Sequence, residues 1–90
     1  MKKVIVILLS FIIFSYTPCF ATAEQELFDN GVQLFNEGQY VNAIKQFSEL
    51  IKIFPNNADA YNNRGVSYIS LKQFDLAIKD FEMVKKLCRI

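Results

Sequence analysis

The sequence predicts an all-α protein made of two tandem helix–turn–helix repeats, a short α-solenoid of four helices after an N-terminal apolar signal helix. The first observation is that residues 31–47 recur about 34 residues further along the chain. The second is that apolar residues in each copy recur at the spacing of one helix face. The third is that Gly38 and Pro55 stand where helices would end. The identical pairs are Gly31 and Gly65, Val32 and Val66, Gln39 and Gln73, Ala43 and Ala77, Ile44 and Ile78, Lys45 and Lys79, and Phe47 and Phe81.

Residues 1–23 have the order of segments found in a secretory signal peptide. A basic start is followed by an almost unbroken apolar run over residues 4–16. Ala21 and Ala23 then match the small-residue pattern before a cleavage site, which predicts a mature chain beginning at Glu24. About 13 helical residues reach about 20 Å, less than the roughly 30 Å hydrocarbon core of a membrane. We therefore expect an exported bacterial protein, either periplasmic or secreted.

Two alternatives to cleavage after Ala23 stay open. If the apolar run extends through Pro18 to Ala23, it is nearly long enough to remain as an uncleaved anchor in the inner membrane. In a lipoprotein signal, Cys19 would carry the lipid, but Tyr16 and Pro18 stand where such signals prefer Leu and a small residue. Otherwise Cys19 is part of the discarded signal.

The first repeat, residues 24–57, begins with an expected helix over residues 24–36. Gly38 ends this helix, because a residue without Cβ takes the left-handed conformation at little cost. Acids in the expected first turns would complement the positive end of the helix dipole. These acids are Glu24, Glu26 and Asp29, and the inner face carries Leu27, Gly31 and Leu34.

The second helix of this repeat is expected over residues 40–54. Pro55 stops it, and Asn56 and Asn57 suit the turn and the cap of the next helix. Gly31 and Ala43 would let the two helix backbones approach closely, with Phe47 filling the space beside them. The face that packs inward carries Ala43, Phe47, Leu50 and Phe54.

The second repeat, residues 58–90, predicts helices over residues 58–70 and 74–88. Lys72 replaces the turn glycine, and a left-handed Lys costs roughly 1 kcal/mol relative to Gly. The inner faces carry Tyr61, Gly65 and Tyr68 in the first helix and Ala77, Phe81 and Val84 in the second.

The two copies resemble the tetratricopeptide repeat, a helix–turn–helix unit of about 34 residues. The resemblance covers essentially the whole chain after residue 23. In the first copy the family's signature falls on Leu27, Asn30, Gly31, Leu34, Gly38, Tyr40, Ala43, Phe47, Leu50 and Pro55. Asn30 and Leu50 depart from it, since the family usually has Leu and Ala there. In the second copy, residues 60–65 read Ala-Tyr-Asn-Asn-Arg-Gly, a very common opening in this family.

The resemblance implies that the first helix of each repeat lines a concave groove that binds a peptide or a partner helix. Some family members clamp a terminal carboxylate with Lys and Asn at the positions of Phe28 and Val32, so such a clamp is not supported here. The implied groove residues are Gln25, Phe28, Val32, Phe35 and Asn36 from the first repeat, and Asp59, Asn62, Val66, Ile69 and Ser70 from the second.

We expect a non-catalytic module that binds a protein or peptide and needs no cofactor or metal. There is no His, no Cys cluster with metal-ligand spacing, and a net charge of +1, which disfavours acid–base catalysis, metal binding and nucleic-acid binding. Basic and acidic residues alternate on the last helix, as on a solvated face rather than a membrane-binding one. The basic residues are Lys79, Lys85 and Lys86, and the interspersed acidic residues are Asp75, Asp80 and Glu82.

Two repeats are few, because an array normally needs about three to bury a continuous core. Val84 and Leu87 on the last helix would lack a neighbour, so we expect a homodimer through this helix or docking on another protein. A remnant of a longer repeat array with a structural role only is the alternative. Cys88 would form an intermolecular disulfide, remain a free thiol, or pack as a small apolar residue.

Overall fold

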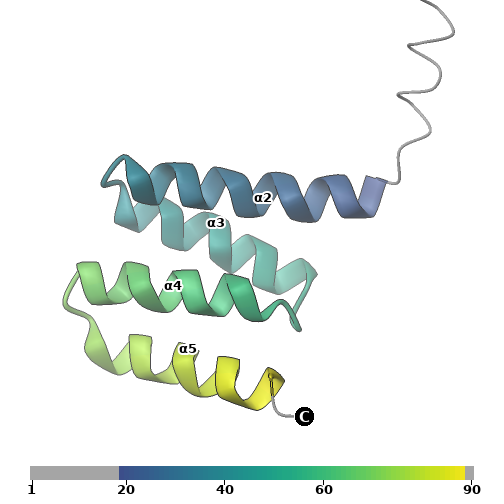
Figure 1. The fold of residues 1–90 in the computed structure, drawn as a ribbon. Helices are drawn as coiled ribbons and strands as arrows, with labels where there is room; N and C mark the ends of the chain where they lie inside the picture. The colour runs from purple at the N-terminus through teal and green to yellow at the C-terminus, as the bar shows by residue number, and fades with distance from the viewer. Residues whose placement is uncertain (1–18, 89–90) are drawn as a thin grey trace, which may run out of the picture.

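The computed structural model describes residues 19–88, with side chains from Ala23 onward. Four helices follow one another along the chain: α2 (Cys19–Asn36), α3 (Tyr40–Ile53), α4 (Ala58–Ser70) and α5 (Phe74–Leu87). They form two antiparallel pairs that stack through contacts between α3 and α4 (Figure 1). This arrangement confirms the all-α fold of two helix–turn–helix units. Most of the segment predicted as a signal peptide lies outside the described residues.

α2 begins five residues earlier than predicted, at Cys19 rather than Glu24. No helix-breaking residue lies between these positions, and alanine is the strongest helix former. As a result, the first turn of α2 contains no acidic residue, and the expected match between the acids and the helix dipole is wrong for the full chain. Glu24 instead accepts a hydrogen bond from Asn57 Nδ2 at 2.8 Å.

The two intra-repeat turns have the same geometry although their residues differ. Gly38 has φ +78°, and Lys72, one repeat further, has φ 62°. In each copy the amide that follows donates to a carbonyl five residues earlier, from Gln39 to Leu34 and from Gln73 to Tyr68, both at 2.8 Å. This bond is typical of a helix that ends in a left-handed residue. Both turn predictions are confirmed, including the left-handed conformation of Lys72.

The core lies where the helices of each pair cross. Phe47 is fully buried, and a Cβ added to Gly31 would lie 2.5 Å from a carbon of its ring. The second repeat reproduces this contact, with 2.9 Å between a Cβ at Gly65 and the ring of Phe81. The predicted packing of Phe47 beside Gly31 is therefore confirmed. The buried apolar residues are Ala43, Phe47, Leu50, Ala60, Tyr61 and Ala77, whereas Phe54, Tyr68, Phe81 and Val84 are half-buried.

A buried ion pair links α4 to α5, and a further hydrogen bond links its arginine to α3. This ion pair was not predicted from the sequence. Asp80 of α5 is only 4% exposed, and its carboxylate accepts from Arg64 Nη2 at 2.7 Å and from Nε at 2.9 Å. Arg64 Nη1 also donates to Ser48 Oγ of α3 at 3.1 Å. The guanidinium lies 5.6 Å and 5.8 Å from the ring centroids of Tyr61 and Tyr68. The assignment of Asp80 to a solvated face is therefore wrong.

This environment favours the charged form of Arg64. The hydrogen bond to Asp80 raises the pKa of the guanidinium above its ordinary value, although partial burial acts in the opposite direction. A bidentate pair of this kind constrains distance and orientation together. It therefore sets how α5 sits on α4, while the bond to Ser48 ties α4 to the first repeat.

The connection between the repeats depends on Asn57. Its side-chain Oδ1 accepts from the backbone N–H of Ala60 at 3.0 Å, which confirms the predicted N-cap of α4. Its Nδ2 donates to Glu24 of α2, so one side chain caps a helix and bridges the two repeats. Of the helices formed by residues 19–88, none combines the length and the apolar character needed to cross a membrane.

Candidate interaction groove

Two hollows lie along the face formed by α2 and α4, the first helices of the two repeats. Because α3 lies behind these helices, a side chain of α3 forms part of the floor (Figure 1). The acidic hollow has a volume of about 350 Å³ and is lined by Glu24, Gln25, Phe28, Asn57 and Asp59. The apolar hollow has a volume of about 210 Å³ and is lined by Val32, Phe35, Asn36, Phe47, Asn63 and Val66.

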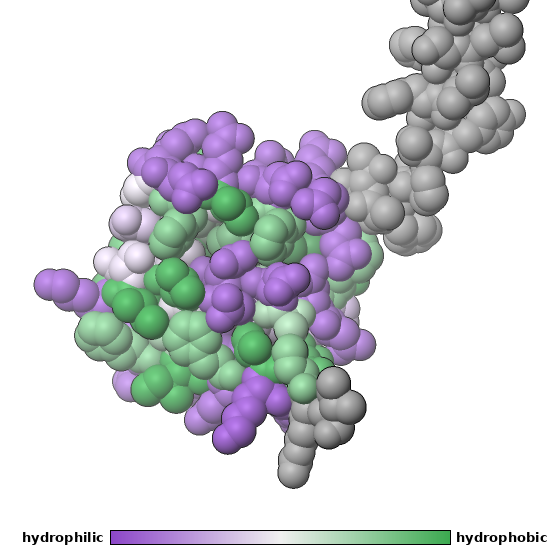
Figure 2. Space-filling model, in the orientation of Figure 1, coloured by the Kyte–Doolittle hydropathy of each residue, from purple (hydrophilic) through white to green (hydrophobic). Residues whose placement is uncertain are grey.

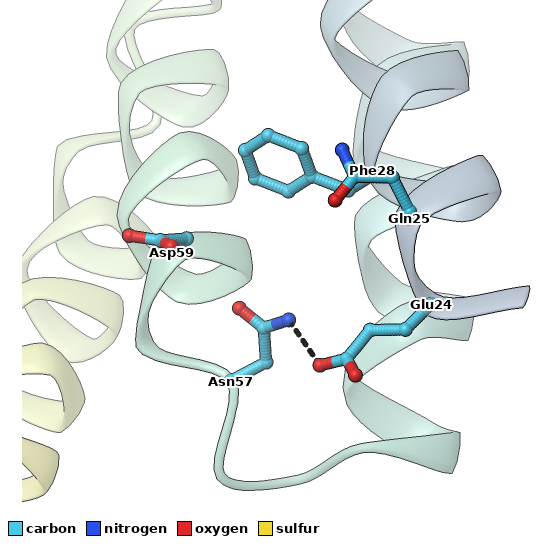
Figure 3. Close-up of a pocket in the computed structure, with 5 residues that line it drawn as sticks. All are labelled: Glu24, Gln25, Phe28, Asn57 and Asp59. Atoms are coloured by element: carbon cyan, nitrogen blue, oxygen red, sulfur yellow. Dashed lines mark hydrogen bonds between the residues drawn. The ribbon is translucent and has the colours of Figure 1, made fainter. Parts of the chain in front are cut away.

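Figure 3 shows the acidic hollow between α2 and the start of α4. Phe28 projects from α2 toward α4, and its ring packs against Phe47 with 6.1 Å between centroids. Asn57, which precedes α4, donates a hydrogen bond to the Glu24 carboxylate of α2. Asp59 lies in the first turn of α4, where the helix dipole favours a carboxylate. The hollow thus combines a fixed aromatic wall with two carboxylates.

The apolar hollow continues the groove toward the other end of α2. The buried ring of Phe47 lies at its floor, and Val32 and Val66 occupy equivalent positions in the two repeats. Phe35 is held by an edge-to-face contact with Tyr40, with 5.2 Å between ring centroids. Amide side chains of Asn36 and Asn63 provide the polar lining. An apolar side chain fits this hollow, since few hydrogen-bonding groups there need a partner.

The structure places seven of the ten predicted groove residues along the two hollows. Gln25, Phe28 and Asp59 line the acidic hollow, and Val32, Phe35, Asn36 and Val66 line the apolar one. The other three, Asn62, Ile69 and Ser70, are exposed residues of α4 that line neither hollow. Ser70 donates its hydroxyl to the carbonyl of Val66 at 3.2 Å, a local helix bond.

Four lining residues were absent from the predicted groove: Glu24, Phe47, Asn57 and Asn63. Phe47 was recognised only as core, and Asn57 only as a helix cap. Glu24 and Asn57 are separated by 33 residues, about one repeat length. That spacing was the available signal, because residues one repeat apart lie side by side when the units stack.

The described residues contain no cluster of potential metal ligands. Among residues 19–88 there is no group of three or more potential metal ligands. Every buried polar side-chain atom in this part of the chain has a hydrogen-bond partner. The groove can therefore hold a ligand by apolar contact and by its carboxylates and amides.

Comparison with known families matches residues 31–72 to the TPR repeat and residues 58–89 to the tetratricopeptide repeat. Together these matches cover 59 of the 90 residues. They include both intra-repeat turns and the junction between α3 and α4.

Several curated proteins are similar over part of this chain. Small glutamine-rich tetratricopeptide repeat-containing protein 2 of Saccharomyces cerevisiae is 46% identical over 43 residues, 48% of this chain and 12% of the yeast protein. Hsp70-Hsp90 organizing protein 3 of Arabidopsis thaliana is 38% identical over 56 residues, 62% of this chain and 10% of the plant protein. Stress-induced-phosphoprotein 1 of Caenorhabditis elegans is 32% identical over 63 residues, 70% of this chain and 20% of the worm protein.

This chain thus spans only about a tenth to a fifth of the length of these relatives. The shared part is the helical repeat, which serves as a scaffold for protein contacts and not as a catalytic unit. The repeated sequence, the paired helices, the turn geometry and the family matches agree, and the chain belongs to the tetratricopeptide repeat family.

Proposed function

We propose that this chain is an exported protein–protein interaction module that binds a peptide or a helix in the groove between α2 and α4. The observation that carries the proposal is the pair of hollows on the face shared by the first helices. Phe28, Val32, Phe35 and Val66 remain only half-buried there, although each is apolar. Apolar side chains kept partly accessible in a concave, pre-formed site favour ligand binding.

The groove suits a short segment. Eight residues separate Phe28 from Asn36, which corresponds to about 12 Å along α2 at 1.5 Å per residue. An extended peptide covers this length with about four residues at 3.3 Å each. Three or four consecutive residues of a partner would therefore contact both hollows.

Relatives that carry the name Hsp70-Hsp90 organizing protein make a chaperone a candidate partner for this chain. Family members that clamp a terminal carboxylate use Lys and Asn where this chain has Phe28 and Val32. We therefore propose that apolar contacts, and not a carboxylate clamp, dominate the binding. A chaperone would have to present an internal segment or one with an apolar end.

The test is affinity capture from the exported fraction with tagged wild-type chain and with two groove variants, Phe28→Ala and Val32→Asp. Val41→Asp is the matched control, because Val41 is 56% exposed on α3 and lines neither hollow. We expect the groove variants to lose the captured partners and the control to retain them. Circular dichroism verifies that all three variants stay folded. An unchanged set of partners in both groove variants would refute the groove as the binding surface.

We further propose that residues 1–23 direct export and are removed. Cleavage after Ala23 would shorten α2 by five residues and place Glu24 at its new start, where the helix dipole favours an acidic side chain. Mass spectrometry of the protein from the envelope or the medium should find Glu24 as the first residue. An intact Met1 would indicate a membrane anchor, and a lipid on Cys19 would indicate a lipoprotein; either would overturn this part of the proposal.

A second candidate function is self-association through α5. Apolar side chains gather over the part of the surface where α4 and α5 lie (Figure 2). Val84 and Leu87, the residues predicted to lack a neighbour, are half-buried, and Val84 has the position of Leu50, which is fully buried. The large exposed apolar residues of α5 are Phe74 (56%), Leu76 (41%) and Ile78 (54%).

The equivalent helix of the first repeat, α3, shows how the exposed face of α5 could be covered. Ile78 is equivalent to Ile44 of α3, which is half-buried in the first repeat, where α4 packs on α3. A second copy would cover α5 in a comparable way. Analytical ultracentrifugation should show a concentration-dependent dimer that Ile78→Lys abolishes. A monomer at high micromolar concentration would refute this candidate function.

A further inference from the structure

We infer that the partner segment carries a Lys or Arg two or three residues away from a large apolar side chain. This inference rests on the proposed function and specifies the occupant of the same groove. The cation would lie in the acidic hollow and the apolar side chain in the apolar hollow.

The charge of the groove has one sign. Among the residues that line the two hollows, the charged ones are Glu24 and Asp59, and both are acidic. Neither carboxylate forms an ion pair with a described residue, since the ion pair found in that part of the chain joins Arg64 to Asp80. The bond from Asn57 uses Oε1 of Glu24, and no described residue donates to Oε2. The hollow therefore offers unpaired negative charge on both sides.

Phe28 adds a second attraction for a cation. Its ring lines the same hollow as the two carboxylates and projects toward α4 (Figure 3). A guanidinium or ammonium group over an aromatic face is attracted by the ring quadrupole. The contact of this ring with Phe47 limits its motion, so little freedom is lost when a ligand binds. A carboxylate in the same place would meet two like charges, so acidic segments and chain ends that carry a carboxylate are disfavoured.

The spacing follows from α2, which contributes to both hollows. Phe28 lies four residues before Val32 and seven before Phe35, which corresponds to about 6 to 10 Å along the helix axis. An extended chain covers this distance in about two or three residues. A cation and an apolar side chain at this separation can occupy both hollows at once.

The test is an NMR titration of the isotope-labelled full chain with acetylated and amidated peptides. The first probe is an eight-residue Gly-Ser peptide with Arg and Leu three positions apart. The second and third replace Arg by Gln and by Glu, and the fourth keeps Arg but replaces Leu by Ser. We expect the Arg–Leu peptide to shift the amide signals of α2 and α4. The Gln–Leu peptide should bind about 3- to 10-fold more weakly, and the other two more weakly than the Arg–Leu peptide.

Protein variants test whether the two carboxylates cause the preference for the Arg peptide over the Gln peptide. The double variant Glu24→Gln and Asp59→Asn preserves side-chain shape and should reduce Arg–Leu binding to the level of Gln–Leu. Glu49→Gln is the matched control, because Glu49 is an exposed acid of α3 that lines neither hollow. It should leave all affinities unchanged.

Three results would overturn the inference: equal affinities for the Arg and Gln peptides, no effect of the double variant, or no binding of the Arg–Leu peptide at millimolar concentration. The proposed function fails by a different result, the retention of captured partners by Phe28→Ala and Val32→Asp. If those variants lose their partners while Arg and Gln peptides bind equally, the groove stands and its charge preference does not.

Discussion

Removal of the Asp80 carboxylate is expected to destabilise the whole stack. The substitution Asp80→Ala would leave the Arg64 guanidinium with Ser48 as its hydrogen-bond partner among the described side chains. The Asp80 side chain is 6% exposed and that of Arg64 is 20% exposed, so water only partly replaces the lost carboxylate. The positive charge would then remain in a largely desolvated site.

The loss of unfolding free energy in Asp80→Ala can be estimated from this burial. Removing one partner of a fully buried pair costs about 3–5 kcal/mol, and the partial exposure of Arg64 lowers our expectation to about 2–3 kcal/mol. A chain of this size unfolds with a free energy of about 5–10 kcal/mol, so Asp80→Ala would remove a large share of the stability. The melting temperature should fall by about 10–20 °C.

Urea and thermal unfolding followed by circular dichroism would measure this loss. Arg64→Ala and the double variant with Asp80→Ala complete a cycle, in which we expect a coupling of at least about 1 kcal/mol. Glu82→Gln is the matched control on α5, since Glu82 is exposed and its loss should cost less than about 0.5 kcal/mol. If Asp80→Ala melts like the control, or if the two single effects simply add, the ion pair does not fix α5 on α4.

The remaining predictions concern the turns and close approaches of the repeat. Gly31→Ala should destabilise by about 1–3 kcal/mol because its Cβ would meet the fully buried ring of Phe47, and Gly65→Ala by less, because its Cβ would lie farther from a half-buried ring. Thermal melts in the reverse order would contradict this account. Lys72→Gly should stabilise by up to about 1 kcal/mol by relieving the left-handed backbone, and an unchanged or lower urea midpoint would show that no strain is present. Asn57→Ala should cost about 1–2 kcal/mol because it removes both a helix cap and the bridge to α2, whereas Asn57→Ser keeps a capping oxygen without the bridging amide and should cost less; equal losses would show that the bridge contributes most of the effect.

The helices and turns were predictable because their determinants are local. α4 (Ala58–Ser70) has the predicted bounds, and α3 and α5 end one residue before the predicted positions. Gly38 and Lys72 adopt the left-handed conformation that the repeat requires at those places. The start of α2 was missed because its prediction assumed that a new segment begins at Glu24.

The groove was predictable only in part. Repeat position alone identified seven of its lining residues, because stacked units place equivalent side chains on one face. It gave no indication that Asn57 reaches Glu24, or that Asn62, Ile69 and Ser70 lie outside both hollows. Those outcomes depend on how far and at what angle the second repeat is rotated on the first.

By itself, the amino-acid sequence determined the repeat, the four helices, the turn conformations and the contact between glycine and phenylalanine inside each pair. These features depend on residues within one repeat length, where spacing along the chain sets proximity in space. Only the tertiary structure decided that Asp80 is buried against Arg64 and that Glu24 and Asp59 share one hollow. Both depend on how side chains pack between helices. The sequence does not show this, because the same charged residue can face water or an oppositely charged partner.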